Sequence, residues 1–378
     1  MHDKFSGFAI SVLVIFSLAL TSCGGREGAS PVLPLLAAGD NHTVAIKKDG
    51  TLWAWGWNFK GQLGNGTNID SNTPVQVETD TNWQSVSAGR EHAVAIKKDG
   101  TLWAWGRNDF GQLGNGTTTS SNKPVQIGTD ANWRSVTAGR LHNVAIRKDG
   151  TLWAWGWNDI GQLGDGTTQQ SNTPIQVGTH ARWRSAAPGA DHTVAIKDDG
   201  TLWAWGANRS GELGNGTNES SSIPIQIGTD ATWLSVSASW YTVAIKKDGT
   251  LWAWGNNYFG QLGNGTNNNC NTPVQIGTGI KWRSVSAGMN QTVAIRKDGT
   301  LWAWGHNYSG AAEGGTSADS NTPVQIGTSA QWRSVSAGWE HTVAVKKDGT
   351  LWAWGLNQDG QLGNGTYKNS NMPVQIRK

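Results

Sequence analysis

Residues 49–56 read D-G-T-L-W-A-W-G, and the same eight residues return at 99–106, 149–156, 199–206, 248–255, 298–305 and 348–355. The spacing is 50 residues in every step but one, which is 49. A period of this length is typical of repeat architectures, in which each copy is one supersecondary unit that needs its neighbours to bury its apolar face. The repeat unit therefore decides the fold.

Each unit predicts four short strands. In the second copy they are expected at 85–88, 92–97, 101–105 and 125–127. Asp99-Gly100 is a strong hairpin signal, because a type I′ turn requires positive φ at both central residues. Pro124 comes just before the fourth strand, which suits the first residue of an edge strand. Apolar residues follow period two and Gly-rich turns break every run, so no helix is expected.

Seven such units predict an all-β fold, a seven-bladed β-propeller of four-stranded antiparallel blades. The expected units are 33–82, 83–132, 133–182, 183–232, 233–281, 282–331 and 332–378. An open solenoid would need atypical capping repeats at its ends, and the seven units leave no residues for caps. We therefore expect a closed ring in which residues 33–37 meet residues 373–376. The two Trp of each W-A-W-G share one face of their strand and are expected to pack against the neighbouring blade.

Three motifs carry a family resemblance: A-G-x-x-H, D-G-x-L-x-x-W-G-x-N and G-Q-L-G-x-G. They resemble the regulator of chromosome condensation repeat family, and the likeness covers residues 33–378. The resemblance implies a seven-bladed propeller. Its functional implication is broad, because family members include a nucleotide exchange factor for a nuclear GTPase, scaffold modules and a secreted bacterial inhibitor of β-lactamase.

Residues 1–22 are predicted to be a lipoprotein-type signal peptide. Lys4 precedes an apolar run over residues 5–20, which is shorter than the stretch of about 20 residues that a transmembrane helix usually needs. The run ends in L-T-S-C at Cys23, which resembles the bacterial lipobox, so Cys23 is expected to be acylated. Residues 23–32 are expected to form a flexible tether. We expect an exported protein anchored in the bacterial cell envelope, at the outer membrane if the cell has two. The alternative is an ordinary secretory signal with an incidental cysteine.

Cysteine count and charge add weaker constraints. With Cys23 acylated, Cys270 stands alone and no internal disulfide can form. A net charge of +3 on 378 residues gives no broad nucleic-acid footprint, and no nucleic-acid partner is expected. Lys or Arg fills 13 of the 14 positions just before the seven D-G turns. We interpret them as a solvated hairpin ring that keeps strand edges soluble; contact with anionic lipid or polysaccharide is the alternative.

The strands alternate in direction, so the loops alternate between two faces. Loops after the first and third strands of each unit open on one face, here called the upper face. The lower face is nearly invariant, whereas the upper face varies and holds all four Trp outside framework positions. Aromatic residues and Arg anchor protein interfaces. The predicted partner-binding residues are Trp57, Phe59, Arg90, Arg107, Phe110, Arg140, Trp157, Ile160, Trp240, Tyr258, Phe259, Met289, His306, Tyr308 and Trp339. The alternative is that these rings fold over the rim as local packing.

Other motifs that resemble chemistry follow the repeat. Five His share the A-G-x-x-H slot: His42, His92, His142, His192 and His341. Zinc needs ligands about 2 Å from one point, and one His per blade does not converge in this way, so we expect structural hydrogen bonds instead. G-Q-L-G-N-G lacks the strand-then-helix context of a phosphate loop. Repeat 4 departs from the unit by carrying Glu212 in place of Gln. No catalytic residues, metal or cofactor are predicted.

The sequence therefore favours a non-catalytic, monomeric scaffold that binds a protein partner through the upper face. Two alternatives stay open. The family resemblance implies guanine-nucleotide exchange, and exposed Trp and Tyr side chains would also suit binding of an envelope glycan. A hydrolytic enzyme would instead need an acid or His with a perturbed pKa on the channel.

Overall fold

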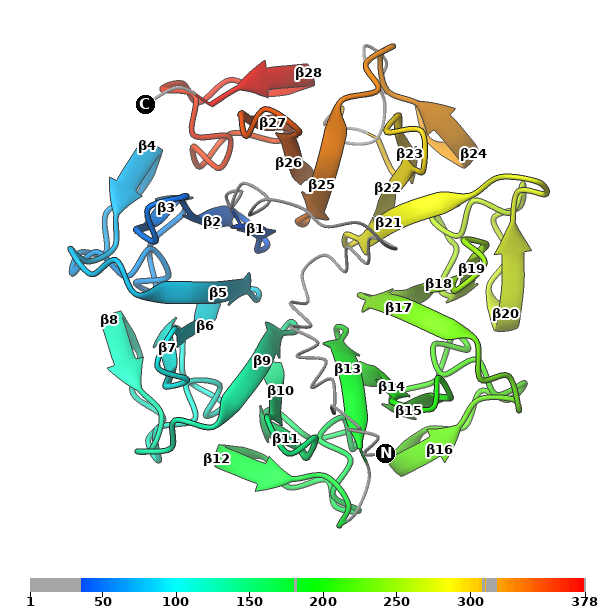
Figure 1. Ribbon diagram of the computed structural model, residues 1–378, viewed down its shortest axis with the longest axis horizontal. Coiled ribbons are helices and arrows are strands. Elements are labelled where there is room, and N and C mark those ends of the chain that lie inside the picture. Colours follow the sequence, from blue (N-terminus) through cyan, green and yellow to red (C-terminus); the bar gives the residue numbers. More distant parts are fainter. Residues whose placement is uncertain (1–34, 180–181, 308–309, 311–317, 377–378) are drawn as a thin grey trace, which may run out of the picture.

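The computed structural model describes residues 35–179, 182–307, 310 and 318–376. Its 28 strands form seven separate four-stranded antiparallel sheets, arranged as blades around one axis (Figure 1). The predicted all-β seven-bladed propeller is thus confirmed. The predicted signal peptide, the tether, Cys23 and Tyr308 lie outside the described residues.

Within each blade the strands follow chain order from the axis outward. Blades 1 to 3 contain β1 Leu35–Ala38, β2 His42–Ile46, β3 Leu52–Gly56, β4 Ser71–Gln76; β5 Trp83–Ala88, β6 His92–Lys97, β7 Leu102–Gly106, β8 Ser121–Gln126; and β9 Trp133–Ala138, β10 His142–Arg147, β11 Leu152–Gly156, β12 Ser171–Gln176. Blades 4 and 5 contain β13 Trp183–Pro188, β14 His192–Lys197, β15 Leu202–Gly206, β16 Ser221–Gln226; and β17 Trp233–Ala238, β18 Tyr241–Lys246, β19 Leu251–Gly255, β20 Cys270–Ile276. Blades 6 and 7 contain β21 Trp282–Ala287, β22 Gln291–Arg296, β23 Leu301–Gly305, β24 Ser320–Gln325; and β25 Trp332–Ala337, β26 His341–Lys346, β27 Leu351–Gly355, β28 Ser370–Gln375.

The outer strand is longer than the sequence indicates. β8 begins at Ser121, so Pro124 lies inside the strand instead of before it. The pairing with β7 shifts register between Ala104 and Gly106, opposite this part of β8. A bulge on an edge strand tolerates a residue without an N–H, because the strand has only one neighbour to pair with.

The D-G hairpin also differs from the expected type I′ turn. The Gly100 N–H donates to the Lys97 carbonyl at 2.9 Å, and the Lys97 N–H donates to the Thr101 carbonyl at 3.1 Å. The central residues of the turn are therefore Lys98 and Asp99, and Gly100 follows with φ +89°. This three-residue loop, a turn closed by a left-handed Gly, is the other common hairpin connection.

The apolar core lies between the blades. Each of seven clusters joins two neighbouring sheets; one contains Ile46 and Leu52 of blade 1 together with Trp83 and Trp105 of blade 2. The second Trp of W-A-W-G is fully buried, and the indole N–H of Trp105 donates to the Gln62 carbonyl of the preceding blade at 2.9 Å. The expected packing of the Trp pair against a neighbouring blade is confirmed.

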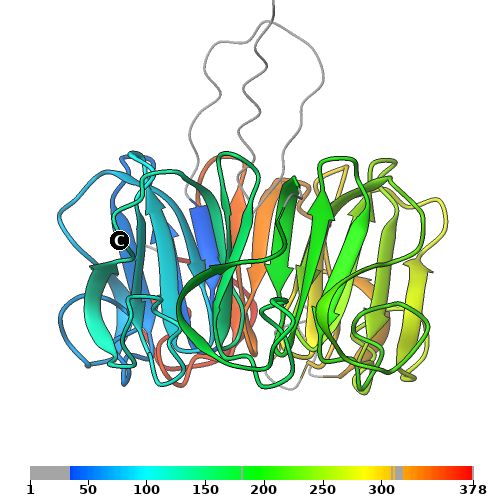
Figure 2. The same cartoon turned by 90° about the horizontal axis from the view of Figure 1, so that it is seen from below.

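Among the described strands, the first and last repeats each complete their own sheet, so the ring closes by packing and hydrogen bonds between blades 7 and 1. Leu36 and Ala38 share an apolar cluster with Val343 and Ile376, as the expected meeting of the two ends of the repeat array requires. The Trp339 N–H donates to the Asp40 carbonyl at 3.3 Å across this junction. Figure 2 shows the blades side by side, with their strands running between two roughly flat faces.

The basic residues before the D-G turns are less solvated than predicted. Lys97 is 9% exposed, and its Nζ lies 3.9 Å from the ring centroid of Trp103 and 4.7 Å from that of Trp83. The cation at this position stacks on indole in every blade, through Lys47, Lys97, Arg147, Lys197, Lys246, Arg296 and Lys346. These cations are part of the packing. The second residue of the pair remains exposed at Lys98.

Candidate protein-binding face

The variable loops of the first and last blades lie on the same face. The Trp57 N–H donates to the Asn41 carbonyl, and the Trp339 N–H donates to the carbonyl of the adjacent Asp40. The two strand-connecting loop types therefore meet on one side of the ring, the upper face.

A buried Asn fixes the longer loops. Asn58 donates through Nδ2 to the carbonyls of Thr67 and Ile69, both at 3.0 Å, and its Oδ1 accepts the Leu63 N–H at 2.9 Å. Because the amide side chain satisfies loop carbonyls and a loop N–H, the loop keeps one shape while the residues on either side of Asn58 vary.

The aromatic residues form three groups. The first is Trp57 stacked on Phe59, with ring centroids 6.2 Å apart and an interplanar angle of 11°. The second joins Phe110 of blade 2 to Trp157 of blade 3 at 6.3 Å. The third comprises Tyr258 and Phe259 of blade 5, whose rings lie 4.9 Å apart, and His306 of blade 6, whose ring lies 4.5 Å from that of Phe259.

Exposure separates these residues. Phe59 is 65% exposed and Tyr258 is 73% exposed, whereas the other predicted binding residues that the structure describes are half-buried. Phe110 and Phe259 contact the following blade, as local rim packing predicts. Partner binding by these residues stays a prediction, and Phe59 and Tyr258 are the most exposed of the predicted rings that the structure describes.

The short loops surround the upper mouth of a central channel with a cavity of ≈ 240 Å³. One residue from each blade lines the mouth: Asp40, Arg90, Arg140, Ala190, Trp240, Met289 and Trp339. Blades 1 to 3 thus supply charged side chains, and blades 5 to 7 supply large apolar ones. The Arg140 guanidinium lies 5.2 Å from the Trp240 ring centroid, past the small Ala190 of the blade between them.

Charges at the mouth are largely paired. Arg90 lies 3.8 Å from an Asp40 carboxylate oxygen and 3.5 Å from one of Glu91. Arg107 also contacts Glu91, at 2.8 Å. The Asp40 side chain is 29% exposed, but burial of the remainder raises its pKa to about 6. The positive charges of Arg90 and Arg140 lower the pKa and offset only part of this rise. Asp40, which the sequence did not single out, therefore changes charge close to neutral pH.

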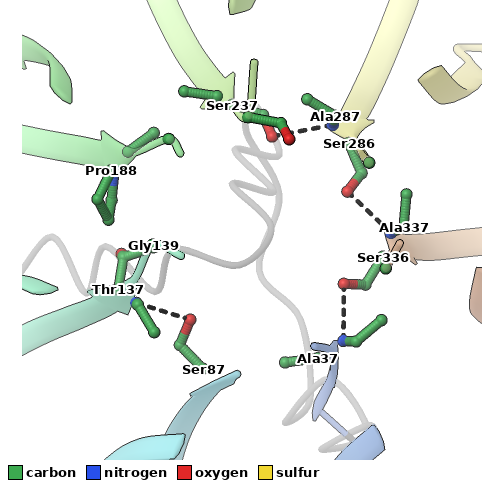
Figure 3. A pocket seen from close by; sticks show the side chains of 18 of the residues that line it. Ala37, Ser87, Thr137, Gly139, Pro188, Ser237, Ser286, Ala287, Ser336 and Ala337 are labelled. Atoms are coloured by element: carbon green, nitrogen blue, oxygen red, sulfur yellow. Dashed lines mark hydrogen bonds between the residues drawn. The ribbon is translucent and has the colours of Figure 1, made fainter. Parts of the chain in front are cut away.

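The channel wall uses its own polar atoms to hold the blades together. The Oγ atoms of Ser87, Ser237, Ser286 and Ser336 accept the N–H of Ala138, Ala287, Ala337 and Ala38 in the next blade, at 3.0–3.1 Å (Figure 3). In blade 3, Thr137 occupies the position of these serines, but the residue opposite it in blade 4 is Pro188, which has no N–H to donate. The serine hydroxyl groups of the channel wall therefore serve to join neighbouring blades.

The five His are buried, and four of them contact a polar side chain of the next blade. His92 contacts Asn143 Oδ1 at 2.8 Å, and His142 and His192 each contact a Thr hydroxyl of the next blade at 2.9 Å. His341 contacts Thr43 at 3.1 Å across the junction of the first and last blades. These contacts confirm the expected structural role for four of the five. In the described part of the chain, no group of three or more His, Cys, Asp or Glu side chains could hold a metal ion.

Burial keeps all five rings neutral. It lowers the pKa of His42, His142 and His192 to about 3 and that of His92 and His341 to about 4. His42 differs from the rest, because neither of its ring nitrogens has a hydrogen-bond partner.

No helix in the described residues is long and apolar enough to cross a membrane.

Comparison with solved structures supports the fold. Human WBSCR16 is 22% identical, with a TM-score of 0.78 over 87% of this chain and 94% of that chain. Prp20p from Saccharomyces cerevisiae is 21% identical, with a TM-score of 0.78 over 90% of this chain and 86% of that chain. At these identities the likeness shows the fold alone.

Similarity to a curated sequence is local. The ultraviolet-B receptor UVR8 of Arabidopsis thaliana is 50% identical over 42 residues, which is 11% of this chain and 10% of the receptor. The regulator of chromosome condensation (RCC1) repeat matches residues 49–96, 99–146, 149–196, 199–245, 248–295, 298–345 and 348–378. These seven matches span most of the chain, which therefore belongs to the RCC1 repeat family.

Proposed function

We propose that this chain is a non-catalytic scaffold that binds a protein partner through the upper face of its propeller. The observation that carries the proposal is the contrast between the two faces. The lower face is nearly invariant, whereas the upper face holds varied aromatic and charged side chains on loops of constant shape. A rigid framework with variable aromatic residues is the usual arrangement of a recognition surface.

The geometry of the aromatic groups suits binding. The Trp57–Phe59 stack and the Tyr258–Phe259 contact hold exposed rings in place before a partner arrives. Pre-ordered side chains lose less conformational entropy on association, so more of the contact energy appears as affinity. Among relatives of similar fold, yeast Prp20 is described with binding to Gsp1p and histones, and it has been solved bound to Kap60. Those partners belong to Prp20, and they support protein binding as a role that this fold can perform.

The proposal is tested with the double variant Phe59→Ala and Tyr258→Ala. Both rings are mostly exposed, so their removal should leave folding unchanged. The matched control is Tyr367→Ala, whose ring is 54% exposed but which is not among the predicted partner-binding residues. Partners are captured from native membranes and their dissociation constants are then measured with purified components. We expect the double variant to bind at least about tenfold more weakly, since interface anchors contribute about 1–2 kcal/mol or more each. Unchanged affinity would refute the assignment of this face.

We further propose that Cys23 carries a lipid that anchors the chain in a bacterial cell envelope. The support is the L-T-S-C sequence at the end of the apolar run. Mass spectrometry of the mature N-terminus should find an acylated Cys23, and Cys23→Ser should move the protein from the membrane to the soluble fraction. An intact Met1 in the purified native protein would exclude this anchoring.

A further inference from the structure

A second, smaller cavity lies between blades 4 and 5, beside the channel mouth, and the neighbouring loop of blade 3 contributes Ile160 to its wall. It measures ≈ 80 Å³ and is lined by Ile160, Asp191, His192, Ala207, Arg209, Glu212, Ser239 and Trp240. This cavity, here called the blade 4–5 pocket, contains two carboxylates. It also contains the residue at which repeat 4 departs from the other units, Glu212.

Glu212 keeps the loop contact of the Gln that it replaces. Its Oε2 accepts the Ser210 N–H at 2.8 Å, as Gln62 Oε1 accepts the Lys60 N–H at 3.0 Å in blade 1. The exchange therefore leaves the loop unchanged and replaces an amide NH₂ with a second carboxylate oxygen. The side chain is only 7% exposed, and an ionised group is rarely buried to this degree without a counter-charge.

Asp191 adds a second carboxylate, one oxygen of which can still accept a hydrogen bond. Its Oδ1 atom is buried and has no hydrogen-bond partner. Burial raises the pKa of both carboxyl groups, and the charge of Asp191 contributes to the shift at Glu212. Arg140 and Arg209 oppose the shift at Asp191, and Arg209 itself lines the pocket. The pocket therefore holds one buried and one half-buried carboxylate against the single cation Arg209, and the unsatisfied Asp191 oxygen favours a further cation as occupant.

The other walls fit the stem of a cationic side chain. Ile160, Ala207 and Trp240 present apolar surface, which can cover methylene groups while a charged tip reaches the carboxylates. The Trp240 ring already lies beside the Arg140 guanidinium, so this indole is in use as a cation partner. A cavity of ≈ 80 Å³ suits the compact ammonium of Lys better than the wide planar guanidinium of Arg.

The net charge of the upper face also favours a cationic ligand. Among described residues, the loops that open on the upper face carry 12 acidic and 6 basic side chains, a difference of six negative charges. The acidic residues are Asp40, Asp70, Glu91, Asp109, Asp159, Asp165, Asp191, Glu212, Glu219, Asp319, Glu340 and Asp359; the basic ones are Lys60, Arg90, Arg107, Arg140, Arg209 and Lys368. The whole chain is net positive at +3, so the acidic excess is particular to this face. Such a face attracts a basic segment of a partner.

We propose that the blade 4–5 pocket receives a lysine side chain from a basic segment of the protein partner, with Asp191 and Glu212 holding its ammonium. This inference rests on the proposed protein-binding function and names the partner chemistry of the same face.

The test uses Glu212→Gln in the full-length protein. This change restores the Gln that five of the other repeats carry, so the loop bond to Ser210 is retained and the variant should melt at or above the wild-type temperature. The matched control is Asp159→Asn, which removes one charge from an exposed position of the same face. The probes are a peptide of alternating Lys and Gly and the same peptide with every lysine acetylated.

By calorimetric titration at low salt, the lysine peptide should bind wild type and Asp159→Asn with similar affinity. It should bind Glu212→Gln at least about tenfold more weakly, as expected when one member of a buried charge pair is lost. The acetylated peptide should not bind wild type. Equal weakening by the two variants, binding of the acetylated peptide or no binding by wild type would each overturn the lysine site.

The two proposals fail in different ways. If Phe59→Ala with Tyr258→Ala weakens the captured partner and Glu212→Gln does not, the upper face binds the partner and the lysine site is wrong. If none of these changes affects the partner, both proposals are wrong.

Discussion

His42 lacks the partner that the equivalent His has in other blades, and one substitution should supply it. His142 and His192 contact the hydroxyls of Thr193 and Thr242 in the following blade. The residue that faces His42 in this register is Ala93, which has no polar side-chain atom. His42 is 0% exposed, so both of its ring nitrogens are buried without a partner.

The substitution Ala93→Thr should complete two hydrogen bonds. By analogy with Thr193, which donates to the Gln162 carbonyl at 2.8 Å, the introduced hydroxyl would donate to the Gln62 carbonyl and accept from His42. Two buried hydrogen bonds contribute about 0.5–1.5 kcal/mol each, and the relief of an unsatisfied buried nitrogen adds to this. Ordering the new side chain costs somewhat less than about 1 kcal/mol. We expect the free energy of unfolding to rise by about 1–2 kcal/mol.

Urea unfolding followed by Trp fluorescence at pH 7.5 measures the change, with Ala93→Val as the control. Val has nearly the shape of Thr without its hydroxyl, so it reports the effect of filling the site. The Thr variant should be more stable than the Val variant by about 1–3 kcal/mol, because Val leaves His42 unsatisfied. If the Val variant equals or exceeds the Thr variant, the hydroxyl does not bond to His42 and the reasoning fails.

Three further predictions concern charge. The five buried His have folded pKa values of about 3 to 4, below the usual 6.5, so their contribution to stability is complete above pH 6.5 and is lost as pH falls. The free energy of unfolding should then fall by up to about 7 kcal/mol per pH unit. A urea midpoint that stays constant from pH 7 to pH 4.5 would contradict this. Asp40, whose folded pKa of about 6 exceeds its usual value, costs stability as pH rises through 6, so Asp40→Asn should be more stable than wild type at pH 7.5 and the gap should close at pH 4; an equal gap at both pH values would argue against a raised pKa. Lys97→Met should lose about 1–2 kcal/mol in urea unfolding, since it removes stacking on two indoles and a 2.8 Å contact with Asp80, whereas Lys98→Met should change stability by less than about 0.5 kcal/mol.

The repeat made most of the fold predictable. Period-two runs and D-G signals recur seven times, so an error in one copy is corrected by the others. The details that escaped prediction depend on local geometry. Pro124 lies within β8 because a bulge accommodates it, and Gly100 follows the central turn residues because the loop has three residues instead of two.

The candidate site was predictable as a face and less so as a set of contacts. Exposure follows the slot that a side chain occupies in the repeat: residues 59, 109, 159, 209, 258 and 358 are exposed, and the residue after each of them is half-buried whatever its type. Phe110 and Phe259 occupy the half-buried slot and contact Trp157 and His306 of the next blade, whereas Phe59 occupies the exposed slot and stacks within its own loop. Comparing adjacent repeats in pairs would have revealed these contacts. Asp40 and Asp191 were missed because burial, which raises their pKa values, is a tertiary property.

The strength of the ring at each junction depends on side chains and not on whether the chain is continuous there. Between blades 7 and 1, which are not consecutive in the chain, Ser336 accepts the Ala38 N–H at 3.1 Å, and Thr43 contacts His341 at 3.1 Å and the Gln361 carbonyl at 3.0 Å. Between blades 1 and 2, Ala37 replaces the serine and Ala93 replaces the threonine, so none of these three bonds can form. Apolar packing is present at both junctions. Of these two junctions, we therefore expect the one between consecutive blades 1 and 2 to open more readily, because its hydroxyl groups are missing.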